Sequence, residues 1–108
     1  MSLNVKTVYP TGILDSTKAD YFRQTINQLL AEEADVILIN LKDVTFVDSS
    51  GLGTLVVVLK QVRSLNRKLY LCSINDQVKM LFNLTSMDKV FEVYEDEEAF
   101  LDAVLPSS

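Results

Sequence analysis

One short apolar run limits most strongly what this chain can fold into. Residues 36–39 read Val-Ile-Leu-Ile and contain no polar side chain. An unbroken run of β-branched and leucine residues is typical of a central strand that is covered on more than one side. The run therefore predicts a sheet centred near these residues, with other elements packed over it.

Strand and helix patterns alternate along the rest of the chain. Strand patterns cover residues 3–9, 36–39, 44–47, 68–73 and 90–94, and a turn at residues 9–12 closes the first of them. Apolar residues recur at helical spacing over residues 19–33, 50–66, 76–86 and 97–104. This order predicts an α/β fold with a largely parallel or mixed sheet and right-handed crossovers.

The segment after residue 53 fits two kinds of structure. Residues 54–58 read Thr-Leu-Val-Val-Val, which favours a strand by propensity alone. Leu52, Leu55, Leu59 and Val62 recur at the spacing of one helix face. We give precedence to the spacing and expect a helix with a broad apolar surface.

Length and composition suit one domain. A chain of 108 residues with 48% hydrophobic residues fits a single domain over residues 1–108, with its core in residues 3–104 and a short tail at 105–108. The first residues carry no signal-peptide pattern, and the longest apolar run, residues 55–59, is too short to span a bilayer. We expect a cytoplasmic protein with no membrane partner. The single cysteine, Cys72, has apolar neighbours and should be a buried thiol.

Charge and residue counts exclude several functions. A formal net charge of -5 argues against direct binding to nucleic acid, which needs clustered lysine and arginine. The chain has no histidine and one cysteine, so Ser-His-Asp catalysis, Cys-His catalysis and histidine- or cysteine-based metal sites are unavailable. We therefore expect a protein that is not an enzyme and has no metal and no cofactor.

The most informative motif lies between the predicted strand at residues 44–47 and the helix that follows. It reads Asp48-Ser49-Ser50-Gly51-Leu52-Gly53. Ser49 or Ser50 could cap the helix by accepting from a free amide of its first turn, while Gly51 and Gly53 permit a tight backbone.

Three further interpretations of this motif remain open. The motif could be a phosphate-binding loop, but it lacks the third glycine of a dinucleotide fingerprint and the Gly-Lys-Ser/Thr end of a P-loop. A nucleophilic serine lacks an identifiable base. A modification site needs only an exposed serine that a kinase can reach, and phosphorylation would add about -1.5 to -2 charge there. The helix N-terminus favours such an anion, whereas Asp48 repels it.

Residues 44–53 resemble the signature of the bacterial anti-sigma factor antagonists, the single-domain members of the STAS superfamily. Residues 11–15, 71–74, 78–82 and 88–91 are similar to further family segments, so the resemblance covers residues 5–104. It implies an α/β fold with a small mixed β-sheet of about four strands and helices packed mainly on one face.

The resemblance also implies a switch. The serine after the motif aspartate, Ser49, would be the phosphorylated residue. The partner-binding surface of the protein would comprise Asp15, Asp48, Ser49, Ser50, Gly51, Leu52 and Gly53. The unphosphorylated protein would bind an anti-sigma factor that is also a serine kinase and so free the sigma factor. Phosphorylation from ATP would release the antagonist, and a metal-dependent serine phosphatase would reset it.

Three positions depart from the family pattern. Ile13 stands where an acidic residue is common, Asp76 replaces a frequent proline, and Ser86 stands where glycine is usual after a helix. The first departure bears on partner recognition and the other two on local geometry. An alternative therefore stays open: a STAS binding module of a non-sigma regulatory or transport complex, in which Ser49 is only a helix cap.

Overall fold

The computed structural model describes residues 3–105. In chain order, its elements are β1 (Val5–Val8), β2 (Gly12–Leu14), the 3₁₀ helix η1 (Ser16–Lys18), α1 (Ala19–Ala31), β3 (Val36–Asn40), β4 (Val44–Val47), α2 (Ser49–Ser64), β5 (Lys68–Cys72), α3 (Asp76–Leu84), the 3₁₀ helix η2 (Met87–Lys89), β6 (Val93–Tyr94) and α4 (Glu97–Val104). We predicted a tail at residues 105–108, and of these residues 106–108 lie outside the described part of the chain.

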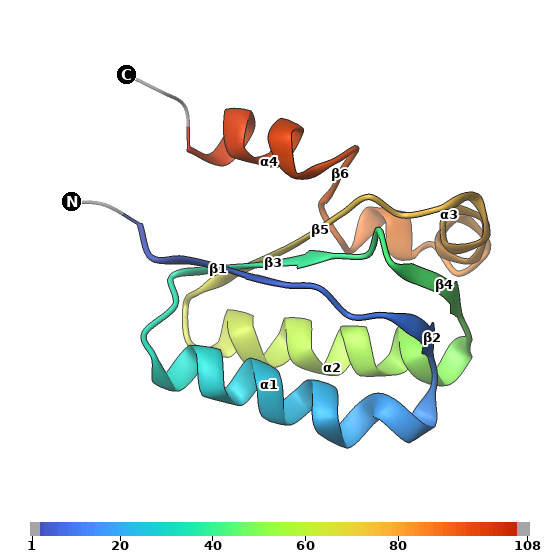
Figure 1. Ribbon diagram of the computed structural model, residues 1–108, viewed down its shortest axis with the longest axis horizontal. Coiled ribbons are helices and arrows are strands. Elements are labelled where there is room, and N and C mark those ends of the chain that lie inside the picture. The colour runs from blue at the N-terminus through green and yellow to red at the C-terminus, as the bar shows by residue number, and fades with distance from the viewer. Residues whose placement is uncertain (1–2, 106–108) are drawn as a thin grey trace.

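The strands form two groups. A four-stranded sheet has the order β1-β3-β5-β6, and β2 pairs separately with β4 (Figure 1). Within residues 3–105 every strand pair is parallel. The predicted α/β class with about four sheet strands is confirmed, and the described pairs are parallel rather than mixed in direction.

The strand β2 was not predicted. We expected a turn at residues 9–12, and the chain does bend there, with Gly12 at a φ of 75° that favours glycine. After the bend, residues 12–14 pair with β4 through a register that shifts between Gly12 and Ile13. Three residues with an irregular register carry too little alternation for a strand to be recognised in the sequence.

Helices cover both faces of the sheet, but mainly one. The helices α1 and α2 lie side by side beneath the four-stranded sheet, and α4 lies above it (Figure 1). All five residues of β3 are buried, which confirms the predicted central strand. Ile37 and Ile39 belong to the core beneath the sheet, whereas Val36 and Leu38 pack with Phe100 of α4. Because its side chains alternate between the two faces of the sheet, β3 contributes to the apolar packing on both of them.

The last strand, β6, is shorter than predicted. We expected a strand over residues 90–94, but only Val93 and Tyr94 pair with β5. The amides of Val90 and Phe91 both donate to the carbonyl oxygen of Met87 at 3.0 Å, which ends η2 and removes these amides from the sheet. Phe91 is buried against Phe82 instead, with ring centroids 5.5 Å apart.

The two departures near α3 preserve the local backbone. Asp76 is the first residue of α3, a position where proline is also favoured. Ser86 has a φ of 60°, so a serine adopts the left-handed conformation that glycine adopts with less strain.

Cys72 of β5 is buried as predicted, and burial raises the pKa of its thiol.

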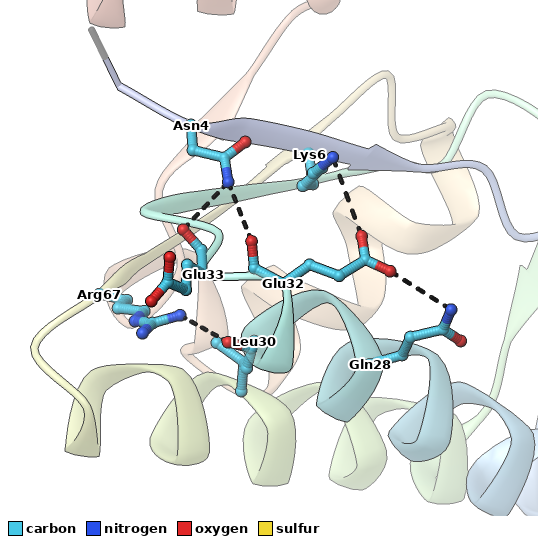
Figure 2. A network of polar contacts seen from close by, with 7 residues as sticks. All are labelled: Asn4, Lys6, Gln28, Leu30, Glu32, Glu33 and Arg67. Carbon is cyan, nitrogen blue, oxygen red and sulfur yellow. Dashed lines mark hydrogen bonds and ion pairs between the residues drawn. The ribbon is translucent and has the colours of Figure 1, made fainter.

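At the amino-terminal end of the strands, polar contacts fix the connection between α1 and β3 (Figure 2). The Asn4 amide donates to the carbonyl oxygens of Glu32 and Glu33 at 3.2 and 3.0 Å. Arg67 donates to the Leu30 carbonyl oxygen at 2.8 Å, and Lys6 lies 3.8 Å from the Glu32 carboxylate. The Asn4 and Arg67 side chains thus donate to carbonyl oxygens at and just after the end of α1, and the Lys6–Glu32 ion pair joins β1 to the same helix end.

Candidate functional site

Two carboxylates follow the paired ends of β2 and β4. Leu14 is paired with Val47, so Asp15 and Asp48 come next at the same end of the two strands. The Asp48 amide also donates to the Leu14 carbonyl oxygen at 3.3 Å. The strand pair therefore brings Asp15 and Asp48 together, directly before Ser49 at the start of α2.

Asp48, and not a serine, caps α2. Its Oδ1 accepts a hydrogen bond from the Gly51 amide at 2.8 Å, and its backbone is extended. The prediction that Ser49 or Ser50 is the cap is wrong, because the helix begins at Ser49 itself. A carboxylate one position earlier already satisfies the helix amide and complements the helix dipole. Ser49 and Ser50 are both exposed.

Asp15 caps the short helix η1. Its Oδ1 accepts hydrogen bonds from the Thr17 hydroxyl at 2.5 Å and from the Thr17 amide at 3.0 Å. The hydroxyl bond, with the amide bond, lowers the pKa of the Asp15 carboxyl below its usual value. Asp15 therefore keeps its negative charge at neutral pH.

The two glycines of the motif have different roles. A Cβ on Gly51 would lie 2.0 Å from the Leu14 carbonyl oxygen, so only glycine lets the first turn of α2 lie against β2. A Cβ on Gly53 would meet no atom within 4 Å, and its φ lies outside the left-handed region. The expectation of a tight backbone is confirmed at Gly51 and wrong at Gly53.

Burial narrows the predicted partner-binding surface. Gly51 is buried, and Leu52 is 7% exposed and belongs to the core beneath the sheet. These two residues support the surface from below. Its accessible part consists of the half-buried Asp15 and Asp48 and the exposed Ser49, Ser50 and Gly53.

An apolar pair borders the two carboxylates. Ile13 of β2 is paired with Phe46 of β4. The two side chains are 49% and 45% exposed, because they point away from the core that Leu14 and Val47 enter. The departure expected at position 13 thus places half of an exposed apolar pair beside the two carboxylates.

Side chains at the start of α3, from its cap residue Asn75 and from Gln77, occupy the other edge of β4. The Gln77 side chain accepts from the Val47 amide and donates to the Val47 carbonyl oxygen, both at 2.9 Å. Asn75 donates to the carbonyl oxygens of Val44 and Thr45 at 3.2 and 3.1 Å. These amides replace a neighbouring strand and hold the chain immediately before Asp48. Asn75 also caps α3, because its Oδ1 accepts a hydrogen bond from the Val78 amide at 2.9 Å. No local pattern in the sequence pointed to the role of Gln77.

Replacing Gln77 with alanine should lower the free energy of unfolding by about 1–3 kcal/mol, because the buried Val47 amide and carbonyl both lose their partner. Urea denaturation measures this change, and hydrogen exchange should show faster exchange at the Val47 amide. Gln24→Ala, on the exposed side of α1, is the matched control. Equal stability of the two variants would contradict the assigned role of Gln77.

Neither a metal site nor a membrane-spanning helix is found in the part of the chain that the structure describes. Across residues 3–105, no three or more histidine, cysteine, aspartate or glutamate side chains are grouped to hold a metal ion. None of the helices in that range has the length and apolar character needed to cross a membrane.

Comparisons with known proteins agree with this fold. A model of the STAS domain family matches residues 2–100. The anti-sigma-B factor antagonist of Staphylococcus aureus (strain NCTC 8325 / PS 47) is 27% identical over 106 residues, which cover 91% of this chain and 98% of the relative. A crystal structure described as an anti-sigma factor antagonist of Thermotoga maritima matches with a TM-score of 0.86 at 26% identity, covering 94% of this chain and 88% of that one.

The fold is also shared with SpoIIAA. The unphosphorylated form of this anti-sigma factor antagonist matches with a TM-score of 0.80 at 18% identity, covering 99% of this chain and 93% of that chain. The phosphorylated form, from Bacillus, matches with a TM-score of 0.69 at 17% identity, covering 94% and 93%. At these identities the likeness concerns the fold alone. The named relatives confirm the resemblance of this sequence to the anti-sigma factor antagonists, and the family match shows that the chain belongs to the STAS domain family.

Proposed function

We propose that this chain is an anti-sigma factor antagonist that phosphorylation of Ser49 switches off. In its unphosphorylated form it binds an anti-sigma factor serine kinase in the bacterial cytoplasm, and the sigma factor is released. The protein acts by binding and not as an enzyme. The observation that carries the proposal is the division of roles at the start of α2: Asp48 makes the cap, so the hydroxyl of exposed Ser49 is not needed there.

The modification changes charge at a surface that is already acidic. The Ser49 hydroxyl attacks the γ-phosphorus of ATP, the bond to ADP breaks, and the hydroxyl proton is lost. The phosphoryl group brings about -1.5 to -2 charge next to Asp15 and Asp48. The free amides and dipole of α2 favour this anion, which lets the fold persist, while the added charge repels a partner surface matched to the unmodified site.

A serine phosphatase completes the cycle. It transfers the phosphoryl group from Ser49 to water, which yields inorganic phosphate and restores the hydroxyl. The exposed position of Ser49 suits both reactions, because neither enzyme has to unfold α2 to reach the oxygen.

Incubation with the kinase from the same organism and ATP, followed by peptide mass mapping, tests the proposal. One phosphoryl group should appear on Ser49, and a Ser50→Ala variant should still be modified there. The proposal would be overturned if Ser49 stayed unmodified in a reaction where the kinase is shown to hydrolyse ATP.

The alternative of a STAS module in a non-sigma or transport complex predicts a different result. Ser49 would then serve only as the first residue of α2, and its charge would not control binding. A single cellular partner captured equally by wild-type and Ser49→Asp protein would favour this alternative.

A further inference from the structure

Gly53 lies on the exposed face of α2, one turn after the proposed phosphoacceptor. Ser49, Gly53 and Val57 are spaced by four residues, so they lie above one another on one helix face. All three are exposed, and Val57 retains 47% of its accessible surface. This face therefore continues the site along the helix away from Asp48.

The fold gives no reason for a glycine at this position. A Cβ on Gly53 would meet nothing within 4 Å, and the backbone has no positive φ. Glycine inside a helix destabilises the helix relative to alanine. Gly51, two residues earlier, shows the contrast, since the Leu14 carbonyl oxygen leaves no room for its Cβ.

Val57 is the second helix residue on this face that folding does not explain. A β-branched side chain loses rotamer freedom in a helix. Val58 and Val62 lose it too, but both are buried in the core, and this burial offsets the loss. Val57 is exposed and has no such compensation. Residues that oppose local stability without a gain in packing are expected at functional surfaces. Gly53 and Val57 lie one turn apart on a single face, so the two observations point to the same place.

We propose that the missing Cβ at Gly53 lets the main chain of the anti-sigma factor pack directly against α2, with an apolar side chain of that partner over Val57. This inference rests on the proposed function, since the same partner must reach Ser49. The charges of this face define the segment of the partner that it can hold. Asp15 and Asp48 lie at one end and the exposed Lys60 lies beyond Val57, so a segment with a basic residue at one end, an apolar centre and an acidic residue at the other is complementary.

A methyl group at position 53 should then act in opposite directions on folding and on binding. In Gly53→Ala, the Tm should rise by about 2–6 °C, because alanine is the better helix residue. The affinity for the purified serine-kinase anti-sigma factor should fall about tenfold, because the methyl group overpacks the contact. Calorimetry measures the second change and thermal unfolding the first.

Ser86→Gly is the matched control. It removes a left-handed serine after α3, so it should also raise the Tm, but it leaves the α2 face unchanged and should bind with wild-type affinity. A loss of affinity in Gly53→Ala alone therefore cannot come from added stability.

The outcomes separate the two proposals. If the kinase binds wild-type protein and Gly53→Ala equally well, the close approach at Gly53 is wrong and the proposed function stands. If the kinase neither binds the wild-type protein nor phosphorylates Ser49, the proposed function is wrong and this inference fails with it. A lower Tm in Gly53→Ala would also overturn the inference, because the glycine would then serve the fold.

Discussion

Ser49→Asp should bind the anti-sigma factor kinase about 100-fold more weakly than the wild-type protein. The substitution places a permanent negative charge beside Asp15 and Asp48, and like charges at an interface cost several kcal/mol. Ser49→Ala should keep wild-type affinity, because the cap of α2 is made by the Asp48 carboxylate and survives the change. Since alanine has no hydroxyl, this variant should remain bound to the kinase after ATP is added.

Isothermal titration calorimetry with the purified kinase measures these affinities, and gel filtration with ATP measures release. Gln24→Glu is the control for charge, since it adds the same single negative charge on the exposed side of α1 and should bind normally. Equal affinities of Ser49→Asp and Ser49→Ala would show that charge at this serine does not operate the switch.

Gly51→Ala should lower the free energy of unfolding by about 3 kcal/mol or more. The new Cβ would lie 2.0 Å from the Leu14 carbonyl oxygen and 2.7 Å from its carbonyl carbon. Neither atom can move freely, because Leu14 is 2% exposed and is paired with Val47 in the neighbouring strand. Relief of the clash requires a shift of α2 away from β2, which opens the core at their contact.

Urea denaturation and thermal unfolding test this prediction, and the Tm should fall by about 12 °C or more. Gly53→Ala makes the same chemical change two residues away and should stabilise the protein, so the pair isolates the effect of the Leu14 contact. A Gly51→Ala variant as stable as the wild-type protein would show that α2 and β2 can separate without cost.

Local patterns predicted the helices and the main sheet well. The buried run in β3 indicated a central strand, and helical spacing over Leu52, Leu55, Leu59 and Val62 correctly overrode the strand propensity of residues 54–58. In both cases the signal lies within one element, where the side chains that share a face are neighbours in the sequence.

The predictions that failed at the site depended on contacts between distant segments. Gln77 holds Val47 from 30 residues away, and no local pattern links them. Gly51 and Gly53 are equivalent in the sequence, and only the position of Leu14 against the first turn of α2 distinguishes them. The cap was misassigned for another reason: Asp48, Ser49 and Ser50 are all good capping residues, and the residue at which the helix begins decides among them.

The cap made by Asp48 has a consequence for how often the proposed switch can be used. A cap formed by the Ser49 hydroxyl would have to be remade with a phosphate oxygen at each phosphorylation and with the hydroxyl again at each dephosphorylation, so the helix start would rearrange in every cycle. Since the carboxylate next to it stays in place, the hydroxyl can be modified and restored while α2 stays intact. In the proposed cycle, one molecule can therefore be modified and restored repeatedly without rebuilding the start of α2.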